Sequence, residues 1–219
     1  MKKYDTILFD LDGTLTDPAT GLIKSFKYAL DKMGVDYGTP ESLTRFIGPP
    51  LYAEWQRVFN FSDSEVDTAL KTFRAYYGEY GWWDNRIYDG IDEMLSKLKA
   101  SGLTLAVATS KPEIFAKKVL KLFEIDKYFD FVGAADTDRT RDKKHEVIDY
   151  VFANLGEEKR KNAILVGDRR YDAEGAAIAG IDSLGVLWGH GSEEEIDGAG
   201  FLYKARTPAD VVSILLQSI

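Results

Sequence analysis

The chain has 219 residues and no cysteine, and 36 acidic against 28 basic side chains give it a formal net charge of −8. Its length and its 45% hydrophobic content predict one folded domain, or one domain with a smaller one. The absence of cysteine excludes disulfides, thiolate metal sites and cysteine nucleophiles. The acidic balance disfavours nucleic acid as a partner. The start of the chain does not match a signal peptide and no apolar run reaches membrane-spanning length, so we expect a cytoplasmic protein without a membrane partner.

The first element is a short apolar strand that runs into two carboxylates. Residues 6–9 precede Asp10-Leu11-Asp12-Gly13, and an extended backbone places Asp10 and Asp12 on the same side of the chain. The two charges repel each other, which a cation or a shared proton would relieve, and hard oxygen ligands favour Mg²⁺. A strand that simply ends in an Asp-Gly turn gives the same pattern, so this stretch alone leaves both interpretations open.

A helical region follows the first strand. A spacing of three or four residues places four apolar side chains on one helix face: Leu22, Phe26, Leu30 and Met33. Thr39 and the proline after it are typical of a second helix start. A short helix over 51–59 and a long one capped by Ser62 or Ser64 complete the region. We therefore expect residues 17 to 80 to form a small all-helical bundle without strands.

From residue 88 onward, strand and helix patterns alternate. The expected helices are 89–100, 112–123, 144–155, 172–179 and 208–216, and the expected strands are 103–108, 129–134, 163–166, 183–187 and, at an edge, 201–203. Repeated strand–helix units predict an α/β fold, a Rossmann-like parallel sheet with helices on both faces. The predicted domains are a discontinuous α/β core, 1–16 and 84–219, and an inserted all-helical cap, 17–83. Ligands in such sheets bind at the carboxyl ends of the strands.

Two of these predicted strand ends carry hydroxyl or basic side chains. Thr109 and Ser110 lie before a predicted helix, where hydroxyls and free amides suit phosphate oxygens, although they also fit an ordinary helix cap. At the start of the helix near 144, one lysine can reach back to a phosphate and to a carboxylate of the first strand. The register of the residues that follow favours Lys144 for this position and leaves Lys143 in solvent.

A further strand end carries a second pair of carboxylates. Asp168 and Asp172 are four residues apart where a helix begins, so they can bring two oxygen donors to one cation. The same two side chains would also complement the dipole of that helix. Each position is ambiguous by itself, but carboxylate, hydroxyl, lysine and carboxylate at successive strand ends indicate one site.

These motifs resemble those of haloacid dehalogenase superfamily phosphatases that carry a helical cap after the first motif. The resemblance covers essentially the whole chain and rests on four motifs: 10–15 (DLDGTL), 107–112 (VATSKP), Lys144 with 146–148 (EVI), and 167–169 (GDR) with Asp172. The loop 47–51 (IGPPL) also resembles the cap loop of phosphoglycolate phosphatases and 5′-nucleotidase-like members. The resemblance implies Mg²⁺-dependent hydrolysis of a small phosphate monoester.

The family resemblance implies a role for each motif residue. Asp10 would be the nucleophile that forms an aspartyl-phosphate, and Asp12 would protonate the leaving alcohol and then activate water. The transferred phosphoryl oxygens would be held by Thr109, the Ser110 amide and Lys144.

The resemblance also implies a metal site and a specificity loop. Mg²⁺ would be bound by Asp10, the backbone carbonyl of Asp12, Asp168 and, directly or through water, Asp172. Residues of the cap loop would recognise the part of the substrate that is not phosphate: Arg45, Gly48 and Pro49.

Other functions fit the same motifs. A phosphosugar mutase of the β-phosphoglucomutase type would pass the phosphoryl group to a second hydroxyl, and a non-catalytic phosphate-binding regulator would keep the fold without turnover. Dehalogenation is disfavoured because it needs neither metal nor an acid at the Asp12 position. We expect a small phosphorylated metabolite as the substrate, and a monomer or homodimer.

Several segments have no role in this interpretation. His145 and Tyr171 match no expected function, and the aromatic stretch 76–83 fits a hinge, a core segment or a contact surface. The acidic segment 192–195 is expected to be a solvated loop.

Overall fold

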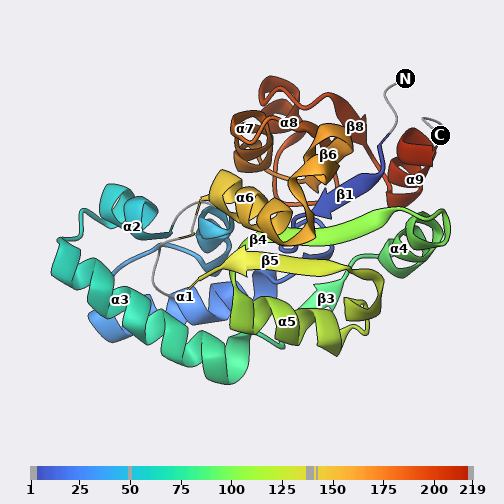
Figure 1. The fold of residues 1–219 in the computed structure, drawn as a ribbon. Coiled ribbons are helices and arrows are strands. Elements are labelled where there is room, and N and C mark those ends of the chain that lie inside the picture. Colours follow the sequence, from blue (N-terminus) through green and yellow to red (C-terminus); the bar gives the residue numbers. More distant parts are fainter. Residues whose placement is uncertain (1–3, 49–50, 137–140, 142, 217–219) are drawn as a thin grey trace. The chain divides into compact units, whose positions relative to one another are not determined.

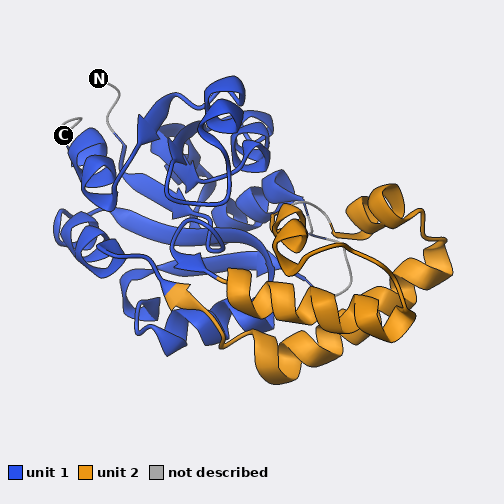
Figure 2. Ribbon diagram, turned by 180° about the vertical axis from the view of Figure 1, so that it is seen from behind, with its two compact units in different colours: residues 1–17, 87–219 blue, residues 18–86 orange. Residues whose placement is uncertain are grey.

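The computed structural model of the chain describes residues 4–48, 51–136, 141 and 143–216. It divides into two compact units, one comprising residues 1–17 and 87–219 and the other residues 18–86 (Figure 2). We refer to these as the α/β unit and the helical unit. The domain boundaries predicted from the sequence, a catalytic core of 1–16 and 84–219 and a cap of 17–83, remain a prediction.

The α/β unit contains a six-stranded sheet in the order β5-β4-β1-β6-β7-β8, and all neighbouring strands are parallel (Figure 1). The strands are β1 (Thr6–Phe9), β4 (Thr104–Pro112), β5 (Phe131–Ala135), β6 (Ala163–Gly167), β7 (Asp182–Val186) and β8 (Tyr203–Ala205). β1 lies at the centre, and its residues are fully buried because helices cover both faces of the sheet. The predicted fold class is confirmed.

Helices lie between these strands in the chain, and the last helix follows β8. They are α4 (Ile91–Ala100), α5 (Glu113–Leu122), α6 (Lys144–Leu155), α7 (Arg170–Ile178), α8 (Glu193–Gly198) and α9 (Pro208–Leu216). α6 and α7 share one core with alternate residues of the central strands, among them Leu8 and Leu165. Figure 1 shows α5 on the opposite side of the sheet from α6. Right-handed crossovers explain this arrangement, because β4→β5 and β5→β6 run in opposite directions across the sheet.

The helical unit contains α1 (Ala19–Met33), a 3₁₀ segment (Pro40–Phe46), α2 (Leu51–Phe59), α3 (Asp63–Tyr76) and a π-helical turn (Tyr77–Gly81). Its core is aromatic: the rings of Phe26, Phe46 and Phe73 contact the fully buried Trp55 or one another. Of the two candidate caps for α3, Ser62 is the one observed, and its backbone N–H donates to the Glu65 carboxylate. The expected helical insertion between β1 and β4 is confirmed.

The clearest differences from the sequence prediction involve four elements. Two short strands, β2 (Thr16–Asp17) and β3 (Arg86–Ile87), pair with each other and are too short to show a periodic pattern. The acidic segment 192–195, expected to be a loop, begins helix α8, because the Ser192 hydroxyl accepts the Glu195 N–H. The edge strand expected at 201–203 is found two residues later, as β8.

No helix in the described ranges is both long enough and apolar enough to cross a membrane.

Candidate active site

The first motif forms a tight loop at the carboxyl end of β1. The backbone N–H of Asp10 donates to Val166 O in β6 at 2.9 Å, which extends the sheet pairing by one residue. Leu11 O then accepts the N–H of Leu15 at 2.9 Å and so closes the loop. Gly13 has a φ of 89°, and a Cβ there would collide with the Asp168 carboxylate. A glycine is therefore required by both backbone conformation and space.

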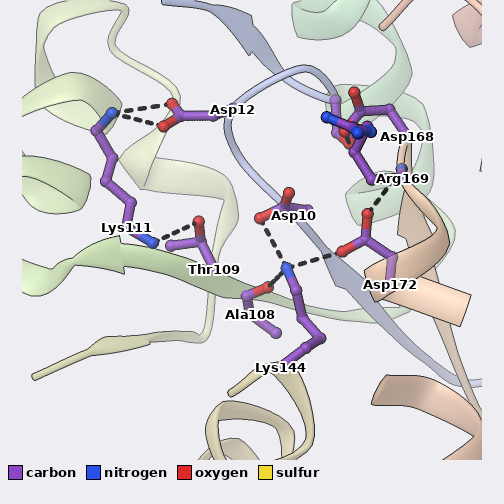
Figure 3. A network of polar contacts seen from close by, with 10 residues as sticks. Asp10, Asp12, Ala108, Thr109, Lys111, Lys144, Asp168, Arg169 and Asp172 are labelled. Atoms are coloured by element: carbon purple, nitrogen blue, oxygen red, sulfur yellow. Dashed lines mark hydrogen bonds and ion pairs between the residues drawn. The ribbon is translucent and has the colours of Figure 1, made fainter. Parts of the chain in front are cut away.

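Three carboxylates meet at this loop: one follows β1, one follows β6 and one lies in the first turn of α7. Asp10, Asp168 and Asp172 each offer an oxygen within 4.8 Å of the others, and the last two are 0% and 1% exposed. The ammonium of Lys144 lies 2.9 Å from Asp10 Oδ1 and 2.8 Å from Asp172 Oδ1, and donates to Ala108 O (Figure 3). Lys143 is exposed. The structure thus brings Lys144, and not Lys143, to the carboxylates of both motifs.

Burial and crowding set the electrostatics of this cluster. Burial, with the charges of Asp172 and Asp10, raises the pKa of Asp168 well above its ordinary value. Burial and Asp10 also raise the pKa of Asp172, against the opposing effect of Lys144. Burial lowers the pKa of Lys144, but the Asp10 and Asp172 carboxylates outweigh it and raise that pKa above the ordinary value.

The cluster fits a divalent cation. The cluster holds three carboxylates and one ammonium, which contacts two of them, so when all are ionised this largely buried group carries an excess of two negative charges. Carboxylate oxygens are the ligands that Mg²⁺ prefers. The chemistry of the donor set therefore agrees with the metal site expected from the sequence, although it does not identify the metal.

Asp168 is held in place by contacts that residue types alone do not reveal. The Thr14 hydroxyl donates to Asp168 Oδ1 at 3.3 Å, and the backbone N–H of His190 donates to Oδ2 at 2.8 Å. A Cβ at Gly189 would collide with the Asp168 side chain. The loop after β7 is thus part of the site, and the glycines on both sides of His190 were the available sequence signal.

Asp172 combines both roles that the sequence left open. It lies in the first turn of α7, where its Oδ2 accepts the backbone N–H of Arg169 at 3.0 Å. Its Oδ1 faces Lys144, so one carboxylate caps a helix and belongs to the acidic cluster.

Asp12 lies apart from the acidic cluster and has its own cation. Lys111 Nζ lies 3.0 Å from Asp12 Oδ1 and 2.7 Å from Oδ2 (Figure 3). Lys111 belongs to the second motif, 107–112, where the sequence indicates no role for it. Thr109 is buried and its hydroxyl accepts the Lys111 N–H at 3.2 Å, whereas Ser110 is exposed. Neither hydroxyl caps α5, which begins after Pro112 without a side-chain cap.

The residues expected to recognise substrate belong to the helical unit. The Arg45 guanidinium lies over the Phe46 ring, 5.0 Å from its centre, and Gly48 has a φ of 101°. Pro49 lies outside the described residues. The roles of all three stay predictions.

The segments without an assigned role divide between core and surface. In the stretch 76–83, Tyr77 stacks on Phe73 in the core, while Tyr80 and Trp83 are exposed. His145 is half-buried in α6, and the Tyr171 ring lies beside the Arg170 guanidinium.

Known proteins resemble this chain over most of its length. The family model "Haloacid dehalogenase-like hydrolase" matches residues 7–186. A 5′-nucleotidase of Pseudomonas aeruginosa is 38% identical, over 89% of this chain and 87% of the nucleotidase. The tyrosine-protein kinase PtkA of Mycobacterium tuberculosis is 39% identical over 87% of this chain, but the match spans only 65% of PtkA. Among solved structures, a predicted phosphatase from Clostridium acetobutylicum has a TM-score of 0.93 at 39% identity, with 98% of this chain and 99% of that chain covered.

Proposed function

The chain belongs to the haloacid dehalogenase-like hydrolase family, and we propose that it is a Mg²⁺-dependent phosphatase that hydrolyses a small phosphate monoester through an aspartyl-phosphate on Asp10. One observation carries this proposal: the two carboxylates of the first motif are separated. Asp10 faces Lys144 in the acidic cluster, whereas Asp12 is held by Lys111. A nucleophile and an acid–base group, side by side in the chain, therefore have distinct surroundings.

In the first step, an Asp10 oxygen attacks phosphorus and the ester P–O bond breaks. The leaving oxygen keeps the electron pair of that bond and takes a proton from Asp12, which yields the free alcohol. Thr109, the Ser110 amide and Lys144 would hold the phosphoryl oxygens, because phosphoryl transfer depends mainly on positioning and charge neutralisation.

In the second step, the Asp12 carboxylate removes a proton from water as the water oxygen attacks phosphorus. The bond between phosphorus and the Asp10 oxygen breaks, and inorganic phosphate and the Asp10 carboxylate are released. Asp12 is protonated again, so the same residue serves both steps and the cycle closes.

The metal site would consist of Asp10, Asp168 and Asp172 together with the backbone carbonyl of Asp12. When bound, Mg²⁺ would neutralise charge on the phosphoryl oxygens and on the clustered carboxylates. Lys144, which contacts both Asp10 and Asp172, would offset the repulsion between these two carboxylates and hold them in place beside the metal.

The candidate substrates come from the 5′-nucleotidase among the relatives and from the resemblance of the loop 47–51 to that of phosphoglycolate phosphatases. A 5′-nucleotide and phosphoglycolate are the first compounds to test, with Arg45, Gly48 and Pro49 as the proposed recognition residues. A hexose phosphate belongs in the same panel, because its isomerisation without phosphate release would indicate the mutase reaction instead.

The direct test is phosphate release from p-nitrophenyl phosphate, with and without Mg²⁺, by wild type, Asp10→Asn and Asp89→Asn. Asp10→Asn keeps the shape of the side chain and removes the nucleophile, and Asp89 is an exposed aspartate of the same unit. We expect Mg²⁺-dependent release by wild type and by the control, and a loss of at least about 1,000-fold in Asp10→Asn. Full activity of purified Asp10→Asn would contradict the proposal.

A further inference from the structure

Lys111 is a buried lysine whose ammonium contacts both oxygens of Asp12. The side chain of Lys111 is 3% exposed and that of Asp12 is 21% exposed. Burying an ammonium is unfavourable unless charge-assisted hydrogen bonds compensate for the lost water, and here two such contacts are made. Lys111 is therefore not a solvated surface lysine, and its contact with Asp12 compensates for its burial.

An irregularity in β4 directs this side chain inward. β4 pairs with β5 at Thr109 and Ala134, and the next pair is Pro112 with Ala135, so two residues of β4 have no counterpart in β5. Within this bulge Ser110 is exposed and Lys111 is buried. Bulges of this kind redirect side chains and are common beside active sites. The local backbone thus aims Lys111 at the loop after β1.

The backbone of that loop is already fixed without Lys111. Leu11 O accepts the N–H groups of Leu15 and Thr16 at 2.9 and 3.0 Å, and the Gly13 N–H donates to Thr16 O at 2.7 Å. The direction of the Asp12 side chain is what these backbone bonds leave free. The contact with Lys111 restricts that remaining freedom (Figure 3).

We propose that Lys111 is a positioning residue that orients the Asp12 carboxylate for proton transfer to the leaving group and from water. This inference rests on the proposed phosphatase function. When Asp12 carries the proton, one of its oxygens keeps the contact with Lys111 while the other donates to the leaving oxygen. When Asp12 is ionised, both oxygens are held as observed, and one is available to a water molecule. Lys144 performs the corresponding task for Asp10, from a different element.

The competing interpretation is that Lys111 binds a phosphoryl oxygen directly. The two roles differ in how the rate depends on the leaving group. Proton donation by Asp12 matters little for p-nitrophenolate, which leaves readily as an anion, and more for phenolate, which is the stronger base. A phosphate-binding lysine would affect both esters equally, because both carry the same phosphoryl group.

The test compares kcat/KM for p-nitrophenyl phosphate and phenyl phosphate at saturating Mg²⁺, which reports the first phosphoryl transfer. The variants are Lys111→Met, Lys111→Arg and, as the exposed control in α5, Lys121→Met. We expect Lys111→Met to lower kcat/KM for phenyl phosphate about tenfold more than for p-nitrophenyl phosphate. Lys111→Arg should restore most of this ratio, because a guanidinium can also hold both carboxylate oxygens. Equal losses for the two esters would overturn the inference.

Two further measurements separate this inference from folding and from the proposed function. An Asp12→Asn/Lys111→Met double variant should lose no more activity than Asp12→Asn alone, and additive losses would overturn the positioning role. The Mg²⁺-induced rise in melting temperature should persist in Lys111→Met, and Lys111→Gln replaces this variant should it not fold. A wild type without Mg²⁺-dependent turnover would reject the proposed function itself, whereas an active wild type with an unchanged ester ratio in the variant would reject only the role of Lys111.

Discussion

The α/β unit and the helical unit bury different kinds of side chain. Within the described ranges, the buried polar or charged residues are Thr6, Thr14, Thr16, Ser25, Thr109, Lys111, Lys144, Asp168, Asp172 and Ser183. Among them, Ser25 alone belongs to the helical unit, and its hydroxyl donates to a carbonyl of its own helix. The helical unit instead buries a cluster of aromatic rings around Trp55.

The α/β unit thus buries charged groups that suit a reaction, and the helical unit buries apolar groups that suit packing. Burying clustered carboxylates opposes folding, whereas burying aromatic rings favours it. The site in the α/β unit therefore lowers the stability of the metal-free protein, and the core of the helical unit raises stability without contributing a charged group. Substitutions in the two units should consequently affect different measurements.

The largest effect on stability is expected in the aromatic core. Trp55→Ala removes a fully buried side chain and should lower the free energy of unfolding of the helical unit by about 3–5 kcal/mol, measured by urea denaturation. Trp83 is 55% exposed, so Trp83→Ala should change that free energy by no more than about 0.5 kcal/mol. Similar losses in the two variants would show that aromatic burial does not stabilise this unit as described.

A smaller effect should appear as a pH dependence of stability. The pKa values of Asp168 and Asp172 are raised in the folded protein, so their protonation favours folding. That stabilisation is fully present below the ordinary aspartate pKa of about 4 and is lost as the pH rises through the raised values. Each group contributes a slope of at most about 1.4 kcal/mol per pH unit.

Asp168→Asn provides the matched comparison for this prediction. Between about pH 4 and 7, the metal-free wild type should lose more stability with rising pH than Asp168→Asn does, and saturating Mg²⁺ should remove the difference. Urea denaturation at several pH values measures both slopes. A wild type that gains stability over this range relative to Asp168→Asn would contradict the description of the cluster.

The sequence predicted the parts of the site that depend on residue type and spacing. Asp10, Lys144, Asp168 and Asp172 follow strands or start helices, and the parallel sheet brings these positions to one edge. The choice of Lys144 over Lys143 could be made from the register of a single helix.

The missed parts depend on tertiary structure. A lysine in a Thr-Ser-Lys-Pro segment gives no sign of burial, and Lys111 is buried only because β4 bulges away from the register of β5. The His190 contact with Asp168 uses a backbone N–H, which any residue other than proline would provide. The segment 192–195 is predicted to be a loop, but it begins helix α8. There the Glu195 carboxylate accepts a hydrogen bond from Arg169, which follows Asp168 in the chain, and the sequence gives no sign of this contact.

The measurement that tests the central claim most directly is chemical trapping of the intermediate on Asp10. The wild type is quenched during turnover of p-nitrophenyl phosphate with Mg²⁺ and treated with borohydride, which reduces an aspartyl-phosphate to homoserine, and residue 10 is analysed by peptide mass spectrometry. We expect homoserine at residue 10 in wild type, and none in Asp10→Asn or in wild type quenched without substrate. Continued turnover with an unmodified Asp10, or trapping at Asp12 instead, would contradict the assignment of Asp10 as the nucleophile.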